Sequence, residues 1–147
     1  KAAPALTLLQ MFDTDFDGKV NQVQATFSET LAGSTATAPW TLTNVPSGGT
    51  LASVSTSGAV ATLTITEGAS AADTSVGSFT IALATNATGI RDSAANQSSF
   101  TAQAPGDKAG PVPVSITDTN GTNDGKFEQA DTMTVTFTES IIGVAAS

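Results

Sequence analysis

The sequence predicts an all-β protein, in which one β-sandwich is followed by the first two strands of a second repeat. Three observations lead to this prediction. Runs in which apolar and polar residues alternate recur along the chain, and this period of two is typical of half-buried strands. Gly, Pro, Asn and Asp separate these runs, as they do at turns. Helix formers are sparse, whereas the β-branched residue Thr is abundant.

A short motif divides the chain because it occurs twice. Lys-Ala-Ala-Pro at 1–4 returns as Lys-Ala-Gly-Pro at 108–111, and an Asp-rich turn ending in Asp-Gly-Lys follows each copy. Both turns lead into a strand-like run, which ends in Phe-Ser-Glu at 27–29 and in Phe-Thr-Glu at 137–139. A repeat of this length is the size of a domain. The expected parts are a domain over residues 1–104, a linker over 105–110 and a partial second repeat over 111–147.

The first half of the domain holds four expected strands. Residues 5–12 form the first, and residues 20–29 form the second, with alternate apolar side chains on one face. The third is centred on Trp40, which we expect to be a core aromatic rather than a surface platform for a ligand. A Pro-Ser-Gly-Gly turn at 46–49 precedes the fourth strand, over residues 50–55.

Three more strands complete the domain. Ala61, Leu63 and Ile65 lie on one face of the fifth, after the break at Gly58. The sixth follows a polar loop and carries Phe79, Ile81 and Leu83. Residues 98–104 form the last. About seven strands in about 105 residues is the count and size of an immunoglobulin-like Greek-key sandwich.

The partial second repeat supplies only two strands, which cannot bury a core by themselves. Two alternatives remain open for residues 111–147. They are the start of a truncated domain, or a hairpin that completes a sandwich in another molecule.

Composition excludes several classes of function. The formal net charge is −8 at pH 7, so nucleic acid and anionic membrane surfaces are not expected as partners. The absence of cysteine and histidine removes disulfides, thiolate metal sites and the usual proton shuttle. No apolar run approaches the roughly 20 residues that cross a bilayer. Paired carboxylates can hydrolyse glycosides. The acidic residues of this chain, however, fall in polar loops without an aromatic cleft, so we expect no enzyme activity.

The turn at residues 13–19 is the best candidate for a binding site. Asp13, Asp15 and Asp17 alternate on a tight bend that Gly18 permits, and Lys19 closes it. Calcium takes six to eight oxygen ligands, and such a turn supplies several. It is not an EF-hand, because the twelfth position is Gln24 and no helices flank the loop. The alternative is a solvated turn chosen for its backbone geometry.

The topology of such a sandwich extends this site. We expect Glu67 or Asp73, and Asp107, to lie at the same pole and near the three Asp residues of the turn. A cluster of like charges is unfavourable without a counter-ion. The sequence therefore predicts Ca²⁺ at this pole.

Two further sites are considered. The opposite pole gathers Glu29, Asp92 and Asn96, which either bind a second calcium ion or tie the loop backbones together by hydrogen bonds. The turn of the second repeat offers fewer charges, so calcium is expected to bind weakly there or not at all. Its oxygen-bearing residues are Asn120, Thr122 and Asp124, with Asp118, Glu128 and Asp131 near them.

These motifs carry a resemblance to a family. The proline-led first strand, the Asp-rich turn, the Phe-Ser-Glu strand end and the run Gly-Ile-Arg-Asp-Ser-Ala-Ala-Asn at 89–96 resemble the bacterial immunoglobulin-like repeats of surface adhesins and S-layer proteins. Ala95 departs from the pattern, since the family usually has glycine there. The likeness implies an extracellular stalk, filament or lattice unit in a longer protein, stiffened by calcium. Its partners would be neighbouring repeats or other copies.

Two other functions remain as alternatives. An adhesin module that recognises carbohydrate or a host protein would need exposed aromatic residues, and most of the seven Phe fall at inward positions. A subunit that polymerises by strand exchange would use the hairpin of the second repeat.

Overall fold

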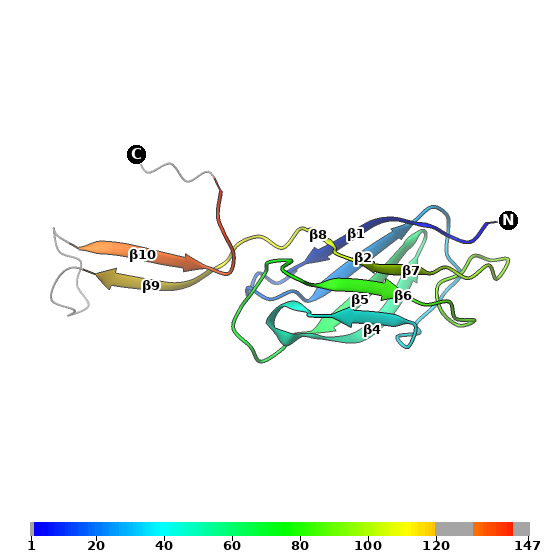
Figure 1. Cartoon of the computed structure of the whole chain (residues 1–147), viewed down its shortest axis with the longest axis horizontal. Coiled ribbons are helices and arrows are strands. Elements are labelled where there is room, and N and C mark those ends of the chain that lie inside the picture. The colour runs from blue at the N-terminus through cyan, green and yellow to red at the C-terminus, as the bar shows by residue number, and fades with distance from the viewer. Residues whose placement is uncertain (1, 120–130, 143–147) are drawn as a thin grey trace.

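The structure, a computed structural model, describes residues 2–119 and 131–142. Apart from one 3₁₀ turn at Pro46–Gly48, its regular elements are all strands (Figure 1). The predicted all-β class is confirmed. In the part of the chain that is described, no helix is long and apolar enough to cross a membrane.

The larger sheet has the strand order β4-β5-β2-β1-β8. Its strands are β1 (Leu6–Phe12), β2 (Gln22–Phe27), β4 (Thr50–Ser57), β5 (Val60–Thr66) and β8 (Gly106–Asp107). Neighbours are antiparallel except for β1 and β8, which pair in parallel. In β2, buried and half-buried side chains alternate, as the period of two in the sequence predicts.

The smaller sheet has the order β3-β6-β7, all antiparallel. Its strands are β3 (Trp40–Thr43), β6 (Thr80–Leu83) and β7 (Phe100–Gln103). Trp40 pairs with Leu83 and is buried, and its ring meets Phe100 edge to face at 5.9 Å between centroids. The expectation that Trp40 is a core residue is confirmed.

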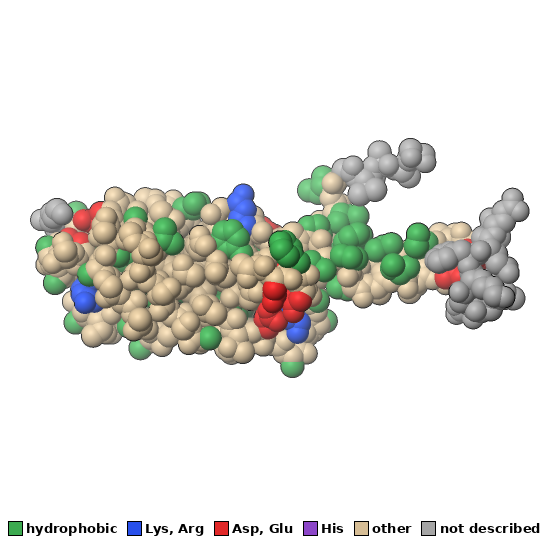
Figure 2. Space-filling model, turned by 180° about the vertical axis from the view of Figure 1, so that it is seen from behind, with side chains coloured by type: hydrophobic (Ala, Val, Ile, Leu, Met, Phe, Trp, Pro, Cys, Tyr) green, Lys and Arg blue, Asp and Glu red, His purple; other side chains and the backbone are tan. Residues whose placement is uncertain are grey.

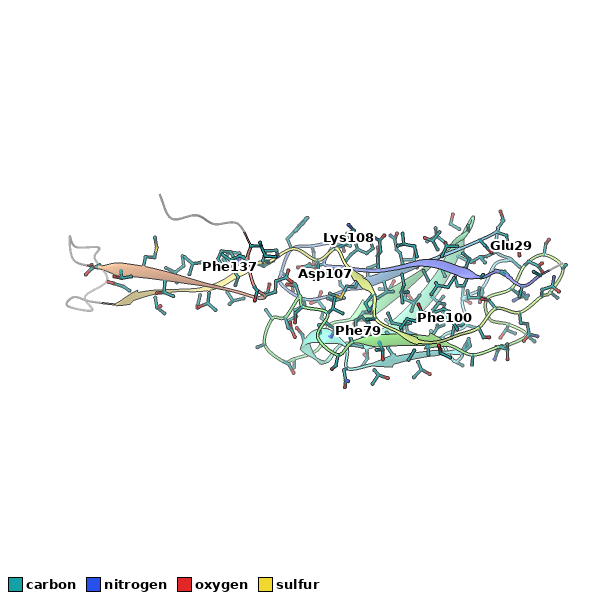
Figure 3. The ribbon with its side chains drawn as sticks, turned by 45° about the horizontal axis from the view of Figure 1, so that its top comes forward. Glu29, Phe79, Phe100, Asp107, Lys108 and Phe137 are labelled. Atoms are coloured by element: carbon teal, nitrogen blue, oxygen red, sulfur yellow. The ribbon has the colours of Figure 1, made fainter. Side chains whose placement is uncertain are left out.

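The two sheets enclose one hydrophobic core. Met11, Val23 and Leu63 of the larger sheet are fully buried, as are Phe79 and Ile81 beside and within the smaller sheet (Figure 3). Apart from Pro4, all the buried apolar residues of the described chain lie between Leu9 and Ala109. The core is therefore complete without β9 and β10.

The expected linker is partly structured. Gly106 and Asp107 form β8 against Gln10 and Met11, and the amide of Lys108 donates to the carbonyl of Met11 over 3.1 Å. Ala109 is buried in the core. Sequence patterns missed this strand because its pairing depends on a distant partner, and the chain leaves the sandwich closer to residue 110 than to 104.

The second repeat forms a two-stranded sheet of β9 (Pro113–Thr119) and β10 (Thr132–Phe137), which projects from one end of the sandwich (Figure 1). Ile116 lies opposite Val135, and Asp118 lies opposite Met133. Val114, Ile116, Met133 and Val135 are all exposed, and by alternation they share one face. This hairpin is amphipathic, with apolar side chains on one face and Ser and Thr on the other.

Candidate metal centre

The turn between β1 and β2 is built around a buried carboxylate. Asp13 is 6% exposed, and its Oδ1 accepts the amide of Phe16 over 2.8 Å while its Oδ2 accepts the amide of Gly18 over 2.9 Å. Gly18 has φ +91°, a conformation that suits glycine. Phe16 also has positive φ, at 61°, and its side chain is exposed. The alternating Asp-x-Asp-x-Asp-Gly pattern is therefore a specific backbone shape held by its first carboxylate.

This shape brings three carboxylates together. Carboxylate oxygens of Asp13, Asp15 and Asp17 all lie within 4.8 Å of one another. Among the described residues, these three form a group of acidic side chains that could hold a metal ion. Asp15 and Asp17 are exposed. Figure 2 shows acidic side chains gathered at the end of the sandwich from which the hairpin projects. Carboxylate oxygens in this arrangement can hold a metal ion.

Two further residues adjoin this group. The side-chain amide of Asn21 donates to Oδ1 of Asp15 over 2.9 Å, while its oxygen accepts the amide and hydroxyl of Thr14. The ammonium of Lys19 donates to the carbonyl of Gly68 over 2.8 Å and so ties the turn to the loop after β5. Sequence reasoning missed Asn21, although its place just before β2 makes it a neighbour of the turn.

Glu67, one of the two alternatives that the sequence suggested, lies close enough to the turn to interact with Asp15 and Asp17. Desolvation and then the charge of Asp17 raise the pKa of Glu67, and the Lys19 ammonium partly offsets this. Desolvation, an interaction with the Asp13 carboxyl and the charge of Asp17 raise the pKa of Asp15, even though its side chain is exposed. The raised pKa values mean that the charged forms of these carboxyls are disfavoured in the folded state, first by desolvation and then by repulsion between the negative charges. A cation would relieve this repulsion.

Asp73 and Asp107 lie in a neighbouring cluster at the same pole. Their partner is Glu139, whose pKa is raised by desolvation and by the charges of Asp107 and Asp73, against a hydrogen bond from Thr74 that lowers it. Asp73 also accepts the amide and the hydroxyl of Ser75, and its backbone forms a bridge with Lys19. Glu139 follows β10 and could be found from sequence only by knowing that the hairpin returns to this pole.

The opposite pole holds the loop that carries Asp92. Its Oδ1 accepts the amides of Ala94 and Asn96, and its Oδ2 accepts the side-chain amide of Asn96 over 2.7 Å. Ala95 has φ +65°, the left-handed conformation that glycine adopts most readily. The geometry of Asp92 corresponds to the hydrogen-bonded alternative rather than to an open ligand set. Glu29 is half-buried at this pole (Figure 3).

The candidate site in the second repeat is mostly outside the described residues, since Asn120, Thr122, Asp124 and Glu128 fall between 119 and 131. Asp118 and Asp131 lie at the ends of β9 and β10, half-buried.

No protein family, curated protein or solved structure matches the chain.

Proposed function

We propose that this chain is a structural repeat of a bacterial cell-surface protein, with an immunoglobulin-like sandwich stiffened by calcium at its acidic pole. The strand orders support the fold. The orders β4-β5-β2-β1 and β3-β6-β7 correspond to the orders D-E-B-A and C-F-G of the two sheets of a constant-type immunoglobulin domain. The repeated motif and the sequence resemblance support the role as one unit of an extracellular stalk, filament or lattice.

The observation that carries the proposal is the position of the carboxylates. Carboxylate oxygens of Asp13, Asp15 and Asp17 converge within 4.8 Å at the pole where the chain passes into the next repeat. The charges of Asp15 and Asp17 also act on Glu67. A cation at this pole would fix the turn that contacts the hairpin. Calcium is favoured because it takes six to eight oxygen ligands in flexible geometry, and the group offers only oxygen donors.

Calcium titration tests this proposal. We expect millimolar Ca²⁺ to raise the melting temperature of the full chain, and the double variant Asp15→Asn, Asp17→Asn to lose most of that rise. Glu29→Gln, at the opposite pole, is the matched control and should keep the full response. Calcium at 5–10 mM exceeds the dissociation constants of weak extracellular sites, which are about 0.1–1 mM. An unchanged melting temperature at that concentration would refute the cation part of the proposal.

Strand exchange is a second candidate, and the exposed face of the hairpin favours it. Ile116 and Val135 pair across β9 and β10 as Leu9 and Ala25 pair across β1 and β2, and they occupy corresponding places in the repeat. Leu9 and Ala25 are buried, whereas Ile116 is 63% exposed and no described residue covers it. The missing cover would come from further strands of a second domain or from another molecule.

Comparing the oligomeric state of the full chain with that of a shorter chain shows whether another molecule covers this face of the hairpin. Under strand exchange, the full chain forms stable oligomers at micromolar concentration and a chain ending at Gly110 does not. Ile116→Thr, which makes this face polar, should return the full chain to a monomer. A full chain that is monomeric at every concentration would leave the hairpin as the start of a second domain.

A further inference from the structure

The same pair of hydrogen bonds occurs at two places in the repeat. The amide of Ser28 donates to the carbonyl of Ala5 over 2.8 Å, and the amide of Ala5 donates to Oγ of Ser28 over 3.0 Å. The amide of Thr138 likewise donates to Val112 over 2.9 Å, and the amide of Val112 donates to Oγ1 of Thr138 over 3.0 Å. The N-terminal end of the sandwich and the base of the hairpin are therefore the same local structure.

At the base of the hairpin, this structure docks on the sandwich. Oγ1 of Thr138 lies 2.7 Å from Oγ1 of Thr74, which is fully buried. The methyl group of Thr138 lies 2.9 Å from the point where a Cβ on Gly18 would stand, and Ala72 and Val112 surround the same point. Gly18 thus leaves room for a side chain of the next repeat. We define Gly18, Ala72 and Thr74 as the docking surface.

We propose that the N-terminal end of the sandwich, formed by Ala5 and Ser28, binds the docking surface of another module of this kind. Both residues are exposed. Oγ of Ser28 accepts the amide of Ala5 and still carries a hydroxyl proton, which it can donate as Thr138 and Thr74 share theirs. The resulting contact is head to tail, so it does not close on itself and adds modules in a line.

The biological use of this contact rests on the proposed role as a structural repeat. The partner must have an open docking surface, and in the full chain the hairpin covers that surface. Two forms expose it. One is the chain ending at Gly110, which keeps every buried apolar residue of the described core. The other is the full chain with Thr138→Asp, which places a charge beside Asp73, Asp107 and Glu139 and so displaces the hairpin.

Binding is measured by two-dimensional NMR of ¹⁵N-labelled full chain, titrated to about 1 mM with either unlabelled form, since a short tether supplies an effective concentration of that order. We expect the amide signals of Ala5 and Ser28 to shift, while those of the labelled chain's own Gly18 and Thr74 stay unchanged. Ser28→Thr restores the methyl group that packs over Gly18, and should tighten binding about fourfold. Gly18→Val in the unlabelled partner should abolish binding.

Several results would overturn the inference. One is that the amide signals of Ala5 and Ser28 do not shift with either partner. Another is that the shifted signals lie elsewhere on the sandwich. A third is that Ser28→Thr leaves the affinity unchanged. Failure of this contact is separable from failure of the calcium proposal. If calcium still raises the melting temperature but the NMR titration is flat, only the docking inference falls.

Discussion

Replacing Asp13 by Ala should destabilise the fold even without any cation. The Asp13 carboxylate is buried and accepts the amides of Phe16 and Gly18. A hydrogen bond to a charged group contributes roughly 1.5–3 kcal/mol. The Phe16 amide can turn to water because the tip of the turn is exposed, whereas the Gly18 amide lies in a buried residue and would be left without its acceptor.

Two effects of Asp13→Ala oppose each other. Loss of the Asp13 carboxylate as an acceptor destabilises the fold by about 2–4 kcal/mol, if the bond from the Gly18 amide is counted in full and the bond from the Phe16 amide in part. Removal of one like charge beside Asp15 and Asp17 stabilises by no more than about 1 kcal/mol, because those two side chains are exposed and screened. The hydrogen bonds win, and we expect a net loss of about 2–3 kcal/mol.

Urea denaturation in a chelating buffer measures this loss. Asp17→Ala is the matched control, since it removes the same charge from an exposed position, where the hydrogen bond that Asp17 accepts from the Lys19 amide is solvent-accessible. It should change the free energy of unfolding by less than about 1 kcal/mol. If Asp13→Ala falls within about 0.5 kcal/mol of wild type, or matches the control, the buried carboxylate does not organise the turn.

Two further predictions concern pH and backbone packing. The pKa values of Asp15, Glu67 and Glu139 are raised in the fold, so their contribution to stability is present below about pH 4 and is lost as the pH rises through the raised values. Without calcium, the melting temperature should therefore fall more as the pH rises from about 4 to 7 than it does in the triple variant Asp15→Asn, Glu67→Gln, Glu139→Gln, and equal slopes would refute this. Gly68→Ala should destabilise by several kcal/mol, roughly the cost of a forced backbone shift, because its Cβ would collide with the backbone of the 46–48 turn. Gly33→Ala should be neutral within about 0.5 kcal/mol in thermal melts, because a Cβ added at Gly33 would have no atom of a non-neighbouring residue within 4 Å. A similar loss of stability at both glycines would exclude the collision as the cause.

Local sequence patterns determined most of the strands of this protein. The alternation in β2 and β5 places Val23, Ala25 and Leu63 inward, and side chains with a period of two can occupy only one face of a strand. The Asp-rich turn was equally predictable, because its carboxylates and glycine are close in sequence and shape their own backbone. These features depend on short-range geometry alone.

Only the tertiary structure decided which distant acids share a cluster. Glu67 joins the Asp-rich turn, whereas Asp73 and Asp107 meet Glu139, a residue that no local pattern connects with them. The pairing of β8 with β1 and the seat of Thr138 over Gly18 depend in the same way on where the chain returns after many residues. Sequence alternation sets which face a side chain takes, but strand order and register set its neighbours, and charge clusters and docking surfaces are made of neighbours.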